Sequence, residues 1–330
     1  MCIYTKYIIN PKYRPNKKNN GRPPKCDDMR KYYIPVKCGH CIECRKQKQR
    51  EWVIRLSEEI RNHTMKFVTL TIDEEHMAKL KTSDESPNDI ATKALRLFLE
   101  RVRKETKKSI RHWCVTELGE NKGRIHLHGF FECRAETIAK HWKYGFIFIG
   151  RWVNEQSIFY MTKYMLKECP YNKHFIGKVL CSKGIGSGYT KRLDAKRNRY
   201  QPNKTKETYR LRDGREMALP QYYRMKLYSE EERDKLWIEK QERGYRYIMG
   251  EKISTENEEE WENAVRYWQR ISQQVFKDNP EDWKIAKEKR KLEKMKRYRR
   301  EHRNRLSPGD AQRPQTTQRK TKRGEPTPDA

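Results

Sequence analysis

Hydrophobic and polar positions follow regular periods between residues 67 and 167, and this stretch predicts a folded core. Residues 67–72 alternate and are rich in β-branched side chains, which predicts a strand. Further strands are expected at 113–117, 125–131 and 146–149, the first two joined as a hairpin by the turn 119–124. Helices are expected at 88–108, 137–143 and 154–167; the first follows Ser86-Pro87-Asn88, and the last begins at Asn154, a good N-cap residue.

The order of these elements predicts an α+β fold, a small antiparallel sheet backed by helices. Residues from Pro170 to about 226 are basic, contain glycine and show little periodicity. Residues 229–305 are predicted to be helical and highly charged, with Ser229-Glu-Glu-Glu232 as a capping start. We therefore expect an N-terminal segment at 1–50, a folded domain at 51–226, a charged helical region at 227–305 and a disordered basic tail at 306–330.

Composition changes this picture by adding a partner. The 330 residues include 76 Lys+Arg and 45 Asp+Glu, a net charge of +31. Residues 101–200 alone carry 22 basic against 8 acidic side chains, so part of the excess lies within the predicted domain. Eleven per cent aromatic residues is too many for a wholly disordered polycation. We expect a polyanionic partner, most often nucleic acid.

The cysteines are expected to be reduced. No stretch approaches the roughly 20 apolar residues of a membrane span, and no apolar segment follows Met1, so we expect neither membrane insertion nor secretion. Nine cysteines in such a chain argue against a disulfide framework.

Three of the cysteines have metal-ligand spacing: Cys38, Cys41 and Cys44. A four-iron cluster is disfavoured because position 48, where a ferredoxin run has cysteine, is Lys48. A structural Zn²⁺ needs a fourth ligand. The sequence offers three candidates for it: Cys2, Cys26 and His40. The alternative is a tight turn that holds reduced thiols.

His126 and His128 lie two residues apart on the second hairpin strand, so both imidazoles are expected on one face, about 7 Å apart, with Leu127 in the core. Glu117 on the neighbouring strand can bring a carboxylate to the same place. Two imidazoles and a carboxylate suit a catalytic Mn²⁺ or Mg²⁺ at least as well as Zn²⁺. Glu120 is the rival third ligand, and two strand histidines without a special role are the alternative.

Residues 160–167 contain Tyr-x-x-Lys twice in tandem, as Tyr160/Lys163 and Tyr164/Lys167. Positions i and i+4 share a helix face, so both phenols can project together toward the sheet with the lysines nearby. A phenol is a weak nucleophile at neutral pH, and nearby ammonium groups favour its phenolate. The alternative is an amphipathic helix that uses Tyr and Met as core residues.

Together these motifs resemble the HUH endonucleases, which initiate rolling-circle replication. The carriers of the resemblance are the strand His-Leu-His, Glu117 nine residues upstream, and Tyr-x-x-Lys about 32 residues downstream. The stretch from Phe67 to Asp73 resembles their first strand motif. The paired tyrosines, the cysteine cluster leading into Trp52, and residues 184–189 (Gly-Ile-Gly-Ser-Gly-Tyr) are similar to replication initiators of gokushovirus-type microviruses, which are single-stranded DNA bacteriophages.

The resemblance implies an HUH palm like that of RNA-recognition domains, with His126, His128 and Glu117 as ligands of Mg²⁺ or Mn²⁺. It implies Tyr160 and Tyr164 as nucleophiles, Lys163 and Lys167 as motif lysines, and cleavage of one origin strand that leaves a 5′-phosphotyrosine. It also implies the cytoplasm of a bacterial host, and a host helicase as a possible partner of the charged helical region. A relaxase or transposase of the same family, or a zinc-containing nucleic-acid-binding protein without catalysis, are the alternatives.

A basic stretch at 183–199 is expected to grip the DNA strand. It mixes three glycines with cations and tyrosines, and lacks the Gly-Lys-Ser/Thr end of a P-loop. Glycines let the backbone approach phosphates closely, cations bind phosphates and aromatic rings stack on bases. The predicted DNA-binding residues are Lys183, Tyr189, Lys191, Arg192, Arg197 and Arg199; a flexible solvated loop is the alternative.

Overall fold

The structure is a computed structural model that describes residues 1–82, 85–119, 123–150, 153–167 and 175–277. Residues 279–330 form a separate unit, and the predicted helix beyond 277 and the predicted basic tail lie outside the described residues. The predicted boundaries near residues 50 and 226 both fall within the unit 1–278. No helix in the described ranges combines the length and the apolar character that crossing a membrane requires.

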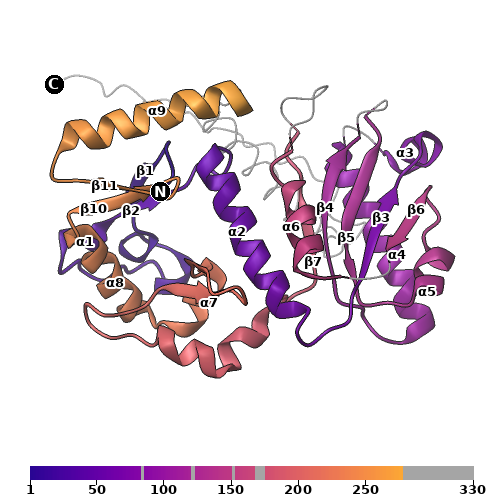
Figure 1. Cartoon of the computed structure of the whole chain (residues 1–330), viewed down its shortest axis with the longest axis horizontal. Helices are drawn as coiled ribbons and strands as arrows, with labels where there is room; N and C mark the ends of the chain where they lie inside the picture. Colours follow the sequence, from indigo (N-terminus) through magenta and orange to yellow (C-terminus); the bar gives the residue numbers. More distant parts are fainter. Residues whose placement is uncertain (83–84, 120–122, 151–152, 168–174, 278–330) are drawn as a thin grey trace, which may run out of the picture. The chain divides into compact units, whose positions relative to one another are not determined.

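A five-stranded antiparallel sheet organises the middle of the chain, so the predicted α+β class is confirmed (Figure 1). Its strand order is β6-β3-β5-β4-β7, with every neighbouring pair antiparallel. Four of the strands were expected from the sequence, whereas β7 lies in the stretch without periodicity. The strands are β3 (Lys66–Thr71), β4 (His112–Leu118), β5 (Ile125–Phe131), β6 (Ile147–Gly150) and β7 (Val179–Cys181).

Helices pack against both faces of the sheet. On one face, Val68, Leu70 and Leu127 are fully buried in a core shared with α4 and α5. On the other, Trp113 and Phe130 pack with α2 and α6. The helices of these layers are α2 (Ile42–Glu59), α4 (Pro87–Thr106), α5 (Ala135–His141) and α6 (Glu155–Lys163), with the short α3 (Glu74–Leu80) between β3 and α4.

The helix predicted at 154–167 ends one turn early. Asn154 caps α6, as its sequence position indicates. After Lys163 the backbone tightens into i→i+3 hydrogen bonds, with Met165 N–H donating to Thr162 O and Leu166 N–H to Lys163 O. Tyr164 is the C-terminal cap residue, so the two tyrosines lie on either side of the helix end.

The stretch from 183 to 228, predicted to be irregular, is folded around a core of its own on α2. Tyr189, Tyr209 and Tyr223 pack there with Ile54 of α2. The buried carboxylate of Glu58 lies 2.5 Å from Arg192, tying this core to α2. The elements are the 3-10 helices η3 (Ser187–Lys191) and η4 (Leu193–Asn198), the strands β8 (Thr208–Arg210) and β9 (Glu216–Ala218), and helix α7 (Gln221–Leu227).

The prediction of continuous helix over 229–305 is wrong at residues 245–254, which form a hairpin. Helix α8 (Glu230–Glu242) is followed by β10 (Tyr245–Ile248) and β11 (Glu251–Ser254), and then by α9 (Glu258–Phe276). The turn residues Met249 and Gly250 both have positive φ, 54° and 100°. Two-residue turns of this kind match the twist of antiparallel strands, and Gly250 accommodates one of them without strain.

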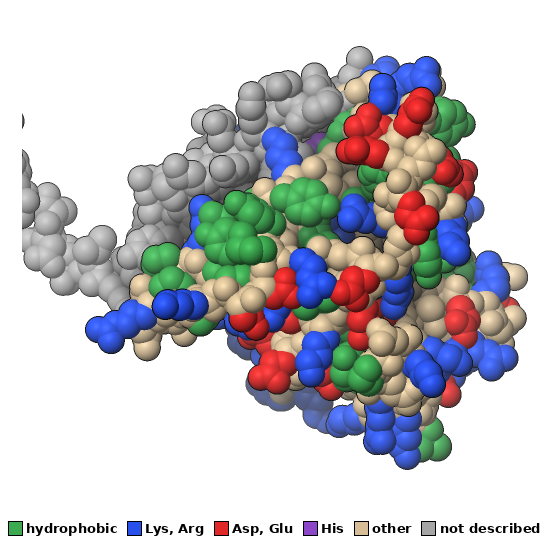
Figure 2. Space-filling view, turned by 90° about the vertical axis from the view of Figure 1, so that its left-hand side faces the viewer, with side chains coloured by type: hydrophobic (Ala, Val, Ile, Leu, Met, Phe, Trp, Pro, Cys, Tyr) green, Lys and Arg blue, Asp and Glu red, His purple; other side chains and the backbone are tan. Residues whose placement is uncertain are grey.

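These C-terminal elements pack on the N-terminal segment. That segment contains β1 (Lys6–Ile9) paired with β2 (Tyr33–Val36), the 3-10 helices η1 (Pro11–Tyr13) and η2 (Lys17–Asn19), and α1 (Met29–Tyr32). Lys12 pairs with Asp234 of α8 at 3.2 Å, and Gln269 of α9 donates to Ile3 O at 2.8 Å. On the face in Figure 2, Lys and Arg side chains are interspersed with Asp and Glu, so the basic excess forms no continuous patch there.

Candidate active site

The register of three strands brings the predicted metal ligands into adjacent rows on one face of the sheet. Glu117 of β4 and Thr71 of β3 both lie opposite His126 of β5. In the next row on the same face, Thr69 lies opposite His128. Residues opposite one another in antiparallel strands share a face, so the carboxylate and both imidazoles point to the same side.

Two threonine hydroxyls orient the imidazoles. Thr69 Oγ1 and His128 Nδ1 are hydrogen-bonded at 3.0 Å, and Thr71 Oγ1 and His126 Nδ1 at 2.8 Å. These contacts occupy the Nδ1 atoms and leave Nε2 as the ligand atom of each ring. Sequence reasoning missed both threonines, although their two-residue spacing matches that of the histidines.

His128 Nε2 lacks a well-directed partner. It lies 2.7 Å from Glu117 Oε2, close enough for an ion pair, yet it is buried and makes no hydrogen bond with acceptable angles. We give the angle more weight than the distance, because a hydrogen bond weakens steeply when it is bent. A buried ring nitrogen beside a carboxylate is suited to a shared cation.

The two tyrosines meet beside this cluster. The Tyr164 ring stacks on His128 with centroids 4.1 Å apart and planes at 5°. Its hydroxyl donates to the Tyr160 hydroxyl at 2.8 Å. Tyr160 is 53% exposed, whereas burial and the hydrogen bond from Tyr164 to Tyr160 raise the pKa of Tyr164. Tyr160 is therefore the more accessible of the two phenols.

Lys167 does not lie where the motif alone suggests. Its ammonium group pairs with Glu117 Oε1 at 2.6 Å and lies 6.0 Å from the centre of the Tyr164 ring, while Lys163 is exposed on α6. Burial raises the pKa of Glu117, but the contacts with His128 and Lys167 outweigh it and leave the pKa below its usual value. Glu117 is thus charged at neutral pH. Burial, followed by the neighbouring His128, lowers the pKa of His126 and keeps that ring neutral.

Gly119 leaves room for His126. A Cβ atom at Gly119 would lie 2.4 Å from His126 Nε2, which is shorter than any real contact. The glycine after the strand thus allows the imidazole its place. Sequence reasoning treated this residue only as part of the turn.

The donor set fits a divalent cation of the kind bound by imidazole and oxygen. Glu117 and His128 already meet, and the threonines fix both rings. Among the described residues, only a group of four cysteines gathers its ligand atoms within 4.8 Å of one another, so His126 is not drawn in that closely. The rival ligand Glu120 lies outside the described residues.

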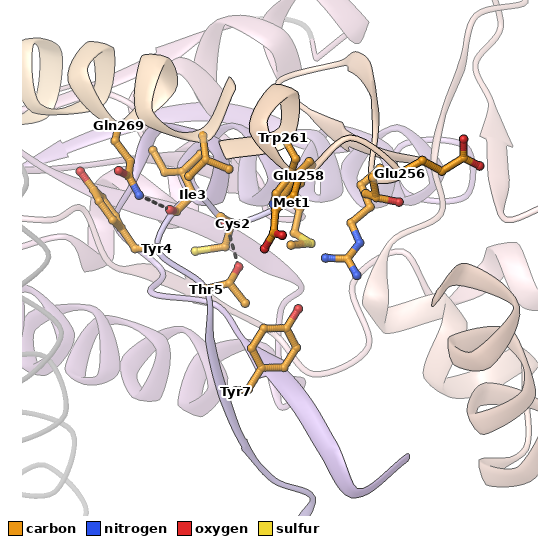
Figure 3. Close-up of a pocket in the computed structure, with 13 residues that line it drawn as sticks. Met1, Cys2, Ile3, Tyr4, Thr5, Tyr7, Glu256, Glu258, Trp261 and Gln269 are labelled. Atoms are coloured by element: carbon orange, nitrogen blue, oxygen red, sulfur yellow. Dashed lines mark hydrogen bonds between the residues drawn. The ribbon is translucent and has the colours of Figure 1, made fainter. Parts of the chain in front are cut away.

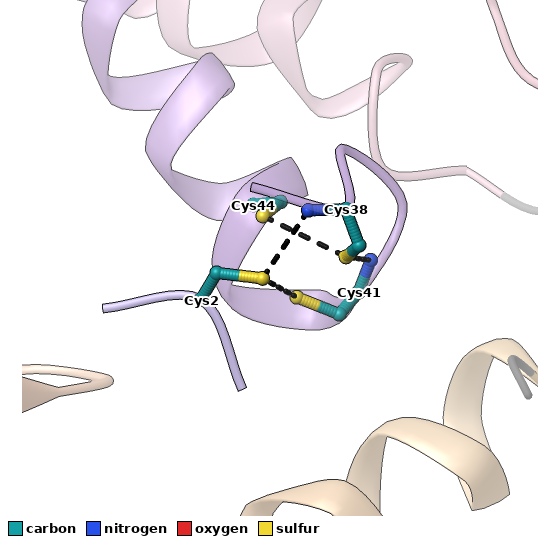
Figure 4. A group of neighbouring side chains, drawn as sticks. All are labelled: Cys2, Cys38, Cys41 and Cys44. Atoms are coloured by element: carbon teal, nitrogen blue, oxygen red, sulfur yellow. Dashed lines mark hydrogen bonds between the residues drawn. The ribbon is translucent and has the colours of Figure 1, made fainter. Parts of the chain in front are cut away.

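The four cysteines form a second metal-ligand cluster at the start of α2 (Figure 4). Their sulfur atoms approach to 3.9 Å between Cys2 and Cys41 and 3.8 Å between Cys38 and Cys44. A tetrahedral zinc with Zn–S bonds of about 2.3 Å places its sulfurs about 3.8 Å apart. Backbone N–H groups of Cys38 and Cys41 donate to the sulfurs of Cys2 and Cys38, both at 3.3 Å, which favours thiolates.

Cys2 is therefore the fourth member of the cluster among the three candidates. Cys26 instead donates its thiol to Asp28 O at 3.0 Å. His40 Nδ1 lies 3.2 Å from Cys38 O. The spacing of Cys38, Cys41 and Cys44 indicated three ligands, and the fold brings the fourth from 36 residues upstream of Cys38.

A cavity of about 640 Å³ lies beside the cysteine cluster and away from the histidines (Figure 3). Residues 1–5 form one wall and α9 another, with Trp261 and Gln269. Its charged residues are of both signs, Arg246 with Glu256 and Glu258. None of the residues that line it belongs to the histidine–tyrosine site, so the cavity is no part of that site.

The predicted DNA-binding residues divide into two groups. Lys183, Lys191 and Arg199 are exposed. Arg192 is paired with Glu58 and Asp194, and Arg197 with Glu216, so their charges are already partly neutralised.

The predicted stacking role of Tyr189 is wrong for this structure. Tyr189 is 1% exposed and its hydroxyl donates to Asn198, so no base can reach its ring. Gly186 likewise serves packing, because a Cβ there would lie 2.5 Å from the carbonyl oxygen of Arg55 in α2. The glycines of this stretch therefore give no evidence for phosphate contact.

Comparison with known proteins agrees with this site. Residues 65–169 match the family model of replication-associated proteins of the ORF2 type. That range contains all three predicted metal ligands and both tyrosines.

Two curated relatives are replication-associated proteins. The chain is 29% identical over 195 residues to the replication-associated protein ORF2 of Spiroplasma virus 4, covering 49% of this chain and 60% of that protein. It is 23% identical over 168 residues to the replication-associated protein ORF4 of Chlamydia phage 1, covering 42% and 40%. The chain thus spans only about half the length of these relatives. No solved structure matches it.

The role of Gly119 is testable by Gly119→Ala. The added methyl group must push His126 aside, and we expect the affinity for Mn²⁺, measured by titration calorimetry, to fall on the order of tenfold, as for lost support of a ligand. Gly123→Ala is the control, because a Cβ there meets nothing within 4 Å. Equal Mn²⁺ affinity of the Gly119→Ala variant and the unmodified protein would show that this glycine does not position a ligand.

Proposed function

We propose that this protein is a metal-dependent endonuclease and ligase of single-stranded DNA that starts and ends rolling-circle replication of a phage genome. The carrying observation is the stack of Tyr164 on His128, which places the tyrosine pair against the imidazole–carboxylate cluster. Nucleophile and metal ligands from different elements, α6 and the sheet, converge there. The similarity to replication-associated proteins of phages supports the same assignment.

Cleavage in this proposal is a transfer of a phosphodiester to a phenol. The Tyr160 oxygen attacks the phosphorus, its proton leaves to solvent, and a bond forms between the phenol oxygen and the phosphorus. The bond from phosphorus to the 3′-oxygen breaks, and that oxygen takes a proton to become a free 3′-hydroxyl. The products are a 5′-phosphotyrosine and a primer end, and no water is consumed.

Glu117, His126 and His128 would hold the divalent ion, Mg²⁺ or Mn²⁺, which when bound draws charge from the phosphate oxygens. The threonines keep the ligand nitrogens oriented. Lys167 holds the Glu117 carboxylate and brings a positive charge beside Tyr164. Both effects favour an anionic phosphate in this place.

We assign the first attack to Tyr160 because its phenol is exposed, whereas Tyr164 is stacked on His128. Tyr164 would then attack the regenerated origin, and the 3′-hydroxyl released would displace Tyr160 from the first 5′ end. This exchange closes a unit-length circle with one phosphodiester made for each one broken. In this proposal the protein acts in the cytoplasm of the bacterial host, with a host helicase as its partner.

The covalent intermediate is the direct test. Incubation with circular single-stranded phage DNA and Mn²⁺ should give a protein–DNA adduct on a denaturing gel. We expect EDTA, His126→Ala, and Tyr160→Phe combined with Tyr164→Phe each to abolish it, because each removes the ion, a ligand or both nucleophiles. Tyr267→Phe, at a tyrosine 49% exposed on α9, is the matched control and should keep the adduct.

Salt-sensitive DNA binding without any adduct on origin-containing strands would contradict the nuclease. It would favour a DNA-binding protein without catalysis.

We propose further that the four cysteines bind a structural Zn²⁺ that joins the N-terminus to α2. Elemental analysis of the purified protein should find about one zinc per chain, the content expected of a closed four-cysteine site. Cys44→Ser should lose the zinc and lower the melting temperature, because metal binding contributes folding free energy. Cys181→Ser, at an exposed thiol outside the cluster, is the control. Zinc-free protein with unchanged stability in Cys44→Ser would rule this site out.

Exposed cations at 183–199 are proposed to bind DNA phosphates. Replacing Lys183, Lys191 and Arg199 together by glutamine should reduce the slope of log affinity against log salt by about 0.7 per lost contact on single strands, or roughly 2 in total. The same charge change at exposed Arg14, Lys17 and Lys18 is the control. An unchanged slope in the first variant would place the DNA elsewhere.

A further inference from the structure

The edge strand β6 carries two exposed aromatic rings beside the candidate active site. Phe146 is 70% exposed and Phe148 is 52% exposed. β6 is the outer strand of the sheet and pairs only with β3 among the described strands (Figure 1). A phenylalanine that exposed on an open sheet edge is a liability for aggregation unless it has a partner.

Strand register places both rings on the face that holds the histidines. Phe148 lies opposite Thr69, which is opposite His128. Thr71 N–H donates to Phe146 O at 2.8 Å, so Phe146 continues the row of Thr71 and His126. Each phenylalanine is thus two strands, about 10 Å, from one of the histidines.

Phe148 has a rigid support. Its ring meets Phe67 edge to face, with centroids 6.0 Å apart, and Phe67 meets the buried Phe130 at 6.3 Å. Gly150, at the end of the strand, lets this packing form, because a Cβ there would lie 3.0 Å from the Phe67 ring. One face of the Phe148 side chain is therefore held by the protein while about half of it is open to solvent.

We propose that Phe146 and Phe148 form a stacking platform for bases of the DNA strand that flanks the cleaved phosphate. This inference rests on the proposed function and names the surface that holds its substrate. Bases stack on aromatic rings without regard to sequence, and exposed rings on a sheet face are a known way to hold single strands. Their rows lead directly to His126 and His128, which suits a strand crossing the sheet edge toward the metal ligands.

Binding measured without cleavage tests the platform. The background is the protein with Tyr160→Phe and Tyr164→Phe in EDTA, and the probe is fluorescein-labelled oligo(dT) followed by anisotropy. Phe146→Leu with Phe148→Leu keeps apolar volume at the edge but removes the rings, and we expect affinity to fall on the order of tenfold per ring. The salt dependence should not change, because no phosphate contact is lost.

Two further variants make the result specific. Phe146→Tyr with Phe148→Tyr keeps the rings and should bind as the background protein does. Leu193→Ala with Met225→Ala, at exposed apolar residues outside the sheet, should also bind normally.

An affinity for oligo(dT) within twofold of background in the leucine variant would overturn the platform. So would a dimer of the background protein on gel filtration that the leucine variant loses while still binding DNA, since the edge would then be a contact between copies. Either result leaves the adduct test of the nuclease unaffected. Failure of the adduct test, in turn, leaves this binding measurement valid.

Discussion

The antiparallel register of β3, β5 and β4 is the constraint on which the candidate site depends. Because side chains alternate between faces, a slip of one residue in β5 would send His126 and His128 into the core against α4 and bring Leu127 to the surface. The core resists such a slip, since Leu127 is fully buried in it. Burial of one face therefore determines the chemistry of the other.

Helix α2 connects the site to the rest of the chain. It begins at the cysteine cluster, where Ile42 N–H donates to Ser272 Oγ of α9 at 3.0 Å. Further along, Val53 and Leu56 pack in one core with Ile158 and Met161 of the tyrosine helix. At its end, Glu58 and Glu59 are buried against arginines of other elements. A metal bound at the cysteines would thus stabilise the helix against which the tyrosines are packed.

Local patterns in the sequence were sufficient for most of the sheet and for the composition of the site. Alternation predicted four of the strands, and the spacing of His126, His128 and Glu117 indicated one shared face. The ion pair of Lys167 with Glu117 could not be predicted, because it depends on α6 ending at Lys163 and on the turn that follows. Nor could the threonine supports, which come from strand pairing across 55 and 59 residues.

The errors have a common physical cause. Residues 183–228 lack periodicity because 3-10 helices and short strands have no long repeating pattern, yet Tyr189, Tyr209 and Tyr223 build a core there. In the helical region, charge dominated the pattern and hid the hairpin, whose signals were the alternation of Tyr245 and Tyr247 and the Met249–Gly250 turn. Exposed rings at Phe146 and Phe148 were hidden as well, because a strand pattern does not say which apolar residues remain open to solvent.

The central claim is that a phenol of the tyrosine pair carries the 5′ end of the cut strand, and peptide mapping tests it most directly. Trypsin separates the tyrosines, because Lys163 lies between them: peptide 152–163 contains only Tyr160, and peptide 164–167 only Tyr164. After a single turnover with Mn²⁺ and nuclease trimming of the DNA, mass spectrometry should find the nucleotide on peptide 152–163. A nucleotide on neither peptide, with the DNA cut, would contradict tyrosine catalysis at this site.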